Sequence, residues 1–547
     1  MKKILSLVLA LFMLATSTVG LTSCKKDEGP AGEETGTYKK YTEEVKFTTV
    51  RNSVTAPNFP EGMSTTQNPY WDYIKKELNV TCEVLWESVS YNDRLSLDIT
   101  SGQLPDVFVV KDYQMYQQLY LSDMIEDLTD VYEQYATEEM KAMYKSYPDI
   151  FTYVTEDDRL MALPSTANGY QQALLWVRKD WLDALNLQAP RTLDEIAAVA
   201  KAFVEQDPGG NGKGNTIGIA INREHAFTGY RNSYGLEPVA GALGAFPKQW
   251  MADDQGKVYY GSVTPEFKQT LALVRSWIDQ GILSKDLLNQ EWEAIWGSVT
   301  SGQAGMWFFP WSWGFYSEFK EKNPRAEVIC YNAPLDKDGK ATFFTGAPFE
   351  EMLVVRKGYE HPEVVFKIMQ LYMDIDSGRH KEGYEACQPL RDSNTVWYAA
   401  APLGSFAIRY DDCIPRDARK LKEYLETGKV PEDTTDVQLQ QWQKAKAWQD
   451  TQEGVDNWAY YTARLTASLA TDEETCNPVN PIYFFQTKTM LDIWDYLVSM
   501  ENDMIRQIMH GEQGIEFFDT FVTDWKEAGG EDVVAEIQAI YDEKYKK

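Results

Sequence analysis

Short apolar runs alternate with amphipathic helical stretches from Val45 onward, and this alternation constrains the fold more than any other feature of the chain. Its first part predicts a strand, a helix, a strand, a helix and a strand at residues 45–50, 69–78, 80–86, 91–101 and 106–110. Strands that alternate with helices in this way form βαβ units around a mostly parallel sheet. The chain is therefore predicted to be an α/β protein.

The same pattern continues through the rest of the chain. It predicts a strand at residues 176–178, helices at residues 179–186, 193–207 and 265–281, and a mostly helical part from Asp417 onward. A length of 547 residues allows three or four domains of roughly 150 residues each. The hydrophobic share of 44% and the charged share of 25% are ordinary for a folded protein, so disorder is excluded as the main state.

Residues 1–23 are expected to be a signal peptide. Lys2 and Lys3 precede an apolar stretch, residues 4–15, that is too short to span a bilayer but suits the apolar region of a signal peptide. It leads to Leu21-Thr22-Ser23-Cys24, which resembles the lipobox of bacterial lipoproteins, whose cysteine is acylated and becomes the mature N-terminus. The resemblance implies lipidation of Cys24. Residues 25–42 are rich in Lys, Glu, Gly and Thr and have almost nothing to bury, which predicts a flexible polar linker at residues 24–44. The alternative is an ordinary secretory peptide with an incidental cysteine.

The acidic composition narrows the classes of partner. Lys and Arg number 53 against 83 Asp and Glu, a net charge of −30, and phosphate binding needs a basic face, so no nucleic acid is expected. The 17 tryptophans and 32 tyrosines favour a flat-faced ligand. The remaining cysteines form no CxxC pair and the histidines are scattered, so we expect neither a zinc nor a thioredoxin-type site, and at most one disulfide.

Several motifs then stand in a fixed order along the chain: Ser101-Gly102-Gln103-Leu104-Pro105-Asp106-Val107, Ile125-Glu126-Asp127-Leu128, Trp176-Val177-Arg178-Lys179-Asp180-Trp181-Leu182, Ser301-Gly302-Gln303-Ala304-Gly305-Met306, His361-Pro362-Glu363-Val364 and the tail from Trp525 to Gly530. Together they resemble bacterial extracellular solute-binding protein family 1, the capture subunits of ABC importers, in the carbohydrate-binding subgroup that includes maltodextrin- and alginate-oligosaccharide-binding proteins. Each motif alone is weak, but the set in one order behind a lipobox is specific. The alternative is a series of generic α/β turn signals.

The resemblance implies a type II periplasmic-binding-protein fold, in which two α/β lobes joined by a hinge close on a ligand cleft. It places lobe 1 at residues 45–166 and 333–392, and lobe 2 at residues 167–332. Residues 393–547 are expected to form a C-terminal helical part that belongs mainly to lobe 2. Crossing segments are expected near residues 166–170, 332–336 and 389–394, of which the third is poorly determined by sequence.

The cleft should lie outside the carboxyl ends of parallel strands. Asp112 and Tyr113 follow the strand at residues 106–110, and the corresponding loop of maltodextrin-binding proteins presents a carboxylate to sugar hydroxyls. Pro310-Trp311-Ser312-Trp313 resembles the PWAW segment of those proteins, whose first tryptophan stacks on a sugar ring. Trp307 and Trp313 are further ligand candidates. The alternatives are a solvated loop or helix cap for Asp112 and core packing for the two flanking tryptophans.

Further candidate ligand-binding residues lie near predicted strand ends and crossing segments. Each of them has packing or capping as its alternative: Tyr91, Asn92, Tyr170, Trp292, Trp296, Phe349, Glu350 and Arg391.

A glycine-rich segment after the helix at 193–207 resembles a calcium loop. Its EF-hand-like positions 1, 5, 7 and 9 would supply metal ligands from Asp207, Asn211, the Lys213 carbonyl and Asn215. Alginate-binding relatives carry calcium at the corresponding loop. Two departures weaken the resemblance, since position 3 is Gly209 and position 12 is Gly218 in place of glutamate. Structural calcium and a plain glycine-rich turn both stay open.

The resemblance implies a lipid-anchored substrate-binding protein on the extracytoplasmic face of the cell membrane, which delivers an oligosaccharide to the transmembrane subunits of an ABC permease. It is expected to be a monomer that performs no chemistry and requires no cofactor. No GxxxxGK[ST] motif is present, so ATP hydrolysis is not expected. Two alternatives stay open: a surface polysaccharide-degrading lipoprotein, which needs two carboxylates across a cleft, and a sensory binding protein that reports to a membrane kinase. A peptide ligand also stays open.

Overall fold

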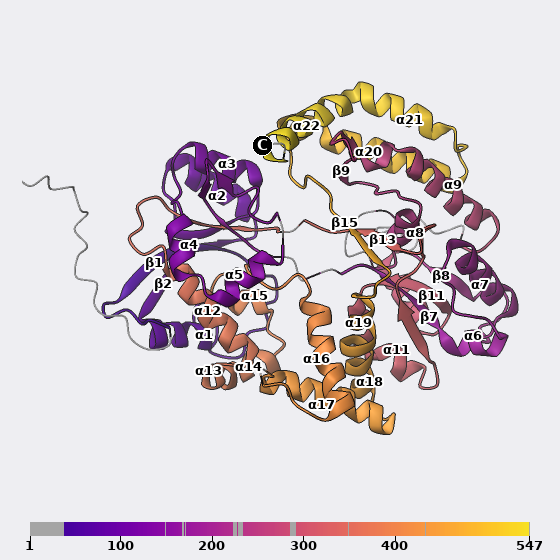
Figure 1. Ribbon diagram of the computed structural model, residues 1–547, viewed down its shortest axis with the longest axis horizontal. Helices are drawn as coiled ribbons and strands as arrows, with labels where there is room; N and C mark the ends of the chain where they lie inside the picture. Colours follow the sequence, from indigo (N-terminus) through magenta and orange to yellow (C-terminus); the bar gives the residue numbers. More distant parts are fainter. Residues whose placement is uncertain are drawn as a thin grey trace, which may run out of the picture.

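The computed structural model describes residues 38–147, 149–166, 169, 171–222, 227, 233–284, 291–347, 349–432 and 434–545. They form two α/β lobes, which lie on the left and on the right in Figure 1. The predicted signal peptide, Cys24, the linker up to residue 37 and Tyr170 lie outside the described residues.

In the first lobe, β1 (Val45–Asn52) pairs in parallel with β2 (Val80–Ser88), and β14 (Met352–Val355) lies antiparallel between β3 (Val107–Val110) and β6 (Leu163–Pro164). Asp106 joins β1 to β3, because its carboxylate accepts hydrogen bonds of 2.8 Å from the amide and the hydroxyl of Thr48. The helices of this lobe are α1 (Pro69–Tyr73), α2 (Tyr91–Ser101), α3 (Tyr113–Leu121), α4 (Thr129–Tyr135), α5 (Glu138–Lys145), α12 (Val364–Ser377), α13 (Lys381–Ala386), α14 (Gln388–Asp392) and α15 (Trp397–Ala400).

The second lobe is built on a mixed sheet with the order β12 (Val328–Tyr331), β7 (Leu174–Arg178), β11 (Ala304–Phe309) and β8 (Ile217–Ala220). β7 runs antiparallel to both of its neighbours, and β11 is parallel to β8. Every residue of β7 and β11 is buried, as expected for a sheet that is covered on both faces. The helices of this lobe before the C-terminal part are α6 (Lys179–Leu185), α7 (Leu193–Gln206), α8 (Glu237–Ala242), α9 (Pro265–Asp279), α10 (Trp292–Thr300) and α11 (Ser317–Lys322).

The first and third crossing segments run side by side. The amide of Thr166 donates to the carbonyl of Ala407 at 2.9 Å, and the hydroxyl of Thr166 accepts from the amide of Arg409 at 2.7 Å. The third crossing therefore lies near residues 407–413, later than the predicted residues 389–394. The reason is local: Pro389 opens the short helix α14 of the first lobe, so the turn signal there marks a helix start. The predicted lobe boundaries at the other positions stay predictions.

The C-terminal part is mostly helical, as predicted, with the short strand β15 (Cys476–Val479) paired in parallel with β13 (Ala341–Phe344). Before β15, the helical elements are α16 (Cys413–Thr427), α17 (Asp436–Thr451), α18 (Val455–Tyr461), η6 (Thr462–Ala467) and α19 (Ser468–Ala470). After it, α20 (Lys488–His510), α21 (Phe517–Trp525) and α22 (Glu531–Tyr545) lie in the upper part of Figure 1 with α9 and β9 (Trp250–Ala252). β9 pairs antiparallel with β10 (Val258–Tyr260), which contacts α22. The end of α22 reaches the first lobe, where Lys544 pairs with Glu156 at 3.2 Å.

The predicted strands and helices are confirmed in outline, and the helix Tyr91–Ser101 has the predicted bounds. The predicted helix at 69–78 is α1 continued by the π-helical η1 (Ile74–Leu78). The prediction of a mostly parallel sheet is wrong, because β7 and β14 run antiparallel to their neighbours. The cysteines in the described residues are all free, so they form no disulfide there. Within the same residues, no helix has the length and apolarity needed to cross a membrane.

Candidate ligand-binding site

The carboxyl ends of the central strands of both lobes adjoin the first crossing. Val110, the last residue of β3, pairs with Met352, which also pairs with Pro164 just before the crossing. In the second lobe, Phe309, the last residue of β11, pairs with Leu174, which follows the first crossing in the sequence. Ligands of open α/β sheets bind outside the carboxyl ends of strands, so these two edges indicate where a ligand binds.

A polar pocket of about 280 Å³ lies at this edge of the first lobe. It is formed by the ends of β1 and β3, the start of α2, the residues before β14 and the segment before the third crossing. The side chains that carry its chemistry are Arg51, Tyr91, Lys111, Glu350, Glu351 and Ser405.

Glu351 is the centre of this pocket. Its side chain is buried, and its Oε1 pairs with Lys111 Nζ at 2.9 Å and accepts a hydrogen bond from the Ser405 hydroxyl. Its Oε2 has no hydrogen-bond partner among the described residues. A carboxylate oxygen accepts hydrogen bonds and an ammonium donates them, so the pair offers both roles to a ligand rich in hydroxyls.

Arg51 fixes the wall of the pocket. Its guanidinium is buried and donates to the carbonyls of Tyr398, Ala399 and Pro402 at 3.0 to 3.2 Å. Because these donors are used by the backbone, Arg51 holds the segment before the third crossing and contributes shape to the pocket more than charge.

Sequence reasoning named some residues of this pocket and missed others. Tyr91 and Glu350 line it as candidates, with Glu350 exposed and the Tyr91 hydroxyl donating to the carbonyl of Val109 at 2.7 Å. Burial, with the nearby Glu351 carboxylate, raises the pKa of Tyr91, so its hydroxyl stays protonated. Lys111 and Glu351 were missed although each is next to a candidate in the sequence. Their pairing depends on contacts across 240 positions, which no local signal shows.

Other candidates of the first lobe have structural roles in this conformation. The Asp112 carboxylate caps α3, accepting from the amide of Met115 at 2.8 Å, which is the alternative that the sequence left open. Tyr113 stacks on Phe485 of the C-terminal part with ring centroids 4.3 Å apart. Phe349 is buried against the same ring, with centroids 5.7 Å apart.

The last two candidates of this lobe do not line the polar pocket. Asn92 is exposed on α2. Arg391 lies over the ring of Tyr384 and donates to that residue's carbonyl at 2.6 Å. These contacts place Arg391 in the packing of α13 and α14.

Some candidate tryptophans of the second lobe lie in its hydrophobic core, and others are partly exposed. Trp307 and Trp313 have no exposed area and pack on each other with centroids 4.7 Å apart, so the ligand role suggested for them is corrected to core packing. Trp311 is 8% exposed on the short helix η5 (Trp311–Phe315), directly after β11. Trp292 and Trp296 are half-buried and stacked on each other, with centroids 6.3 Å apart. Only Trp311 among these lies at the strand edge, and its contact with a ligand stays a prediction.

The glycine-rich loop at residues 207–216 supplies hydrogen-bond donors to the Asp207 carboxylate. Asp207 accepts hydrogen bonds from the amides of Asn211 and Gly212 at 2.9 and 2.8 Å and from the Thr216 hydroxyl. These contacts hold the pKa of Asp207 below its usual value. Position 12, Gly218, lies in β8, where a Cβ would come within 2.9 Å of the Ala200 carbonyl, so no carboxylate fits there. The residues present therefore fit a closed turn better than a calcium site, and bound calcium stays a prediction.

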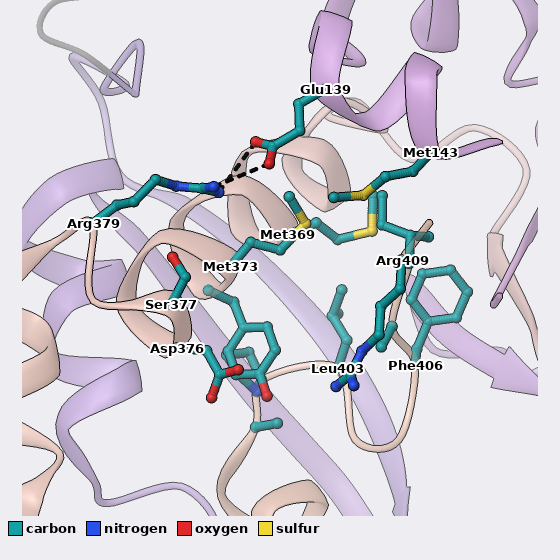
Figure 2. A pocket seen from close by; sticks show the side chains of 15 residues that line it. Glu139, Met143, Met369, Met373, Asp376, Ser377, Arg379, Leu403, Phe406 and Arg409 are labelled. Carbon is teal, nitrogen blue, oxygen red and sulfur yellow. Dashed lines mark hydrogen bonds and ion pairs between the residues drawn. The ribbon is translucent and has the colours of Figure 1, made fainter. Parts of the chain in front are cut away.

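Another cavity, of about 240 Å³, lies on the first lobe between α5, α12 and residues 401–409. Figure 2 shows it with the ion pair between Glu139 and Arg379 at one side, at 3.0 Å. Its walls are mostly apolar and include Met143, Met369, Met373, Leu403 and Phe406. Such walls offer few hydrogen-bonding groups, so this cavity suits a polar ligand less well than the polar pocket does.

Comparison with known proteins agrees with this architecture. A polygalacturonan/rhamnogalacturonan-binding protein of Bacillus subtilis is 30% identical over 216 residues, which are 39% of this chain and 41% of that protein. The fructooligosaccharide ABC transporter substrate-binding protein FusA of Streptococcus pneumoniae is 22% identical over 249 residues, 43% of this chain and 45% of that protein. The matched regions thus span less than half of the length of these relatives.

Solved structures match over a longer range. FusA in complex with kestose covers 91% of this chain and 99% of its own, with a TM-score of 0.56 and 17% identity. The structure of a solute-binding protein of Bifidobacterium longum infantis has a TM-score of 0.61 and 15% identity, and it also covers 91% of this chain and 99% of its own. At these identities the likeness shows the fold, a type II periplasmic-binding-protein fold. The family described as bacterial extracellular solute-binding protein matches residues 56–373, more than half of the chain. With two lobes whose strand ends meet at one crossing, the chain belongs to the bacterial extracellular solute-binding protein family.

Proposed function

We propose that this chain is the substrate-binding lipoprotein of an ABC importer and that it captures an extracellular oligosaccharide between its lobes. The observation that carries the proposal is the polar pocket at the strand ends, where the Lys111–Glu351 pair offers a donor beside an unpartnered carboxylate oxygen. Sugar hydroxyls both donate and accept, so they match this pair better than an apolar ligand does. The relatives named as binding polygalacturonan and fructooligosaccharides support the same ligand class.

In this proposal the chain performs no chemistry. Lipid on Cys24 anchors it to the extracytoplasmic face of the membrane, ligand binding closes the lobes, and the closed form docks on the transmembrane subunits of the permease. A polysaccharide-degrading role needs an acid and a second carboxylate across the sugar. Glu351 is committed to Lys111 and Ser405 instead, which supports a carrier.

A thermal-shift screen against plant, algal and host oligosaccharides, followed by calorimetry, tests the ligand class. Lys111→Met is expected to weaken binding at least about 10-fold, because it removes a donor and leaves Glu351 without its cation. The matched control is Lys76→Met, which breaks an exposed ion pair of 2.8 Å with Glu382 away from the pocket and should bind as the wild type does.

Four results would contradict parts of the proposal. If no oligosaccharide raises the melting temperature, or if both variants bind as the wild type does, this pocket does not hold a sugar. Shortened products after incubation, detected by mass spectrometry, would favour the enzyme. Pull-down of a kinase in place of permease subunits would favour the sensory role.

A further inference from the structure

Two neighbouring hydrogen-bond donors at the carboxyl end of β11 have no acceptor among the described residues. They are the indole Nε1 of Trp311 and the Nε of Arg464. Arg464 lies on η6, a π-helical segment of a kind that is frequent at functional sites. Its guanidinium carbon is 5.3 Å from the centroid of the Trp311 ring and 5.2 Å from that of Phe315. A buried donor without an acceptor is costly, so this pair is suited to an acceptor that the chain itself does not supply.

The charge of Arg464 is also not balanced by an ion pair in the part of the chain that the structure describes. Within the described part of the chain, no carboxylate lies within ion-pair distance of its guanidinium and no group accepts a hydrogen bond from it. The charged groups that act on it are Asp417, which attracts it, and Arg409, which repels it. Asp417 accepts a hydrogen bond of 2.9 Å from Gln438. Burial lowers the pKa of Arg464, and Asp417 offsets this effect in part. A half-buried cation in such surroundings favours an anionic partner.

The position of this donor pair is the ligand edge of the second lobe. Trp311 follows β11, whose last residue, Phe309, pairs with Leu174 beside the first crossing. Arg409, which is close enough to repel Arg464, lies in the third crossing and is bonded to Thr166. The donors therefore adjoin the same crossings as the polar pocket of the first lobe.

We propose that Arg464 and the indole N–H of Trp311 bind a carboxylate of the ligand, so that the captured oligosaccharide is an acidic one built from uronate residues. This inference rests on the proposed function and names its substrate class. A carboxylate only accepts hydrogen bonds, and its two oxygens match one guanidinium and one N–H, whereas a sulfate or phosphate presents more oxygens than these donors serve. A local cation is needed because the net charge of −30 repels an acidic polymer.

Calorimetry with matched ligands tests the proposal. The probes are oligogalacturonate and oligomannuronate of three to six residues, each as the free acid and as the fully methyl-esterified neutral form. We expect the wild type to bind one acid at least 10-fold more tightly than its ester. Arg464→Gln should lower the affinity for that acid at least 10-fold and leave the ester unchanged, and Arg464→Lys should restore part of the loss.

The control is Arg506→Gln. Arg506 lies on α20 and forms an exposed ion pair with Glu512, so the substitution removes the same charge, and the variant should bind the ligands as the wild type does. Equal binding of acid and ester by the wild type would overturn the inference, as would equal losses in Arg464→Gln and Arg506→Gln. If neither acid binds while a neutral oligosaccharide does, the inference fails and the proposed function stands. If no oligosaccharide of any kind binds, both fail. The comparison of acid with ester in the wild type decides the matter even if Arg464→Gln does not fold.

Discussion

Replacing Phe485 with alanine is expected to loosen the contact between the lobes. Phe485 precedes α20 in a segment that is bonded to both lobes. The amide of Ile482 donates to the carbonyl of Trp250 in the second lobe at 2.8 Å, and the carbonyl of Ile482 accepts from the Tyr153 hydroxyl of the first lobe. The ring of Phe485 packs against aromatic side chains of the first lobe. The centroid distances are 4.3 Å to Tyr113, 5.2 Å to Tyr153 and 5.7 Å to Phe349. Phe485 thus joins the C-terminal part to the opposite lobe.

The magnitude follows from these pairs. An aromatic pair contributes about 0.5–1.5 kcal/mol beyond the burial of its area, and since Phe485 is only partly buried we take about 2 kcal/mol for the three together. This corresponds to a roughly 30-fold shift of the equilibrium between closed and open lobes. In the proposed function the ligand binds the closed form, so its apparent affinity should fall by up to the same factor.

Small-angle scattering and calorimetry measure these two effects. Phe485→Ala is expected to raise the radius of gyration of the free protein and to weaken oligosaccharide binding. The matched control is Phe151→Ala, because that partly buried ring contacts Tyr132 and Tyr144 within the first lobe, at 5.5 and 4.9 Å. The control should lower the melting temperature without changing the radius. If Phe485→Ala also lowers only the melting temperature, its segment moves with the first lobe and the reasoning is refuted.

Four other predictions concern the anchor, the edge tryptophan and the glycine-rich loop. Cys24→Ser should leave the chain without lipid, because the thioether of a lipoprotein forms on sulfur; a wild-type lipid mass in mass spectrometry would contradict this. Trp311→Ala should weaken ligand binding roughly 30-fold, and it should also lower the melting temperature because the ring is only 8% exposed. Trp311→Phe should keep part of the affinity and part of the stability. Unchanged affinity of the folded Trp311→Ala variant would assign the ring to the core alone. A calcium chelator should leave the melting temperature unchanged, and a fall that calcium reverses would establish a metal site. Asp207→Ala should lower the melting temperature at neutral pH. This difference from the wild type should vanish as the pH falls through the lowered pKa of the Asp207 carboxyl, because protonation then removes the same hydrogen bonds from the wild type. A difference in melting temperature that does not depend on pH would contradict this.

The sequence alone determined the α/β class, the main elements and the family. Hydrophobic periodicity is a local property, so the helix Tyr91–Ser101 and the buried strands could be predicted from their own residues. The order of short motifs led to the two-lobe fold, because motifs at element ends keep their order wherever the elements pack.

Only the tertiary structure decided which side chains meet. Lys111, Glu351 and Ser405 come together from positions up to 294 apart, and no local pattern marks such a pairing. Trp311 and Trp313 are two positions apart on one short helix, yet one lies at the strand edge and the other has no exposed area. The direction of a side chain depends on the neighbours that the fold supplies. Hydrophobic periodicity is the same for parallel and antiparallel strands, so the antiparallel direction of β7 and β14 could not be predicted from their own residues. The sequence therefore supplies the candidate residues, and the packing of the lobes determines which of them line a pocket.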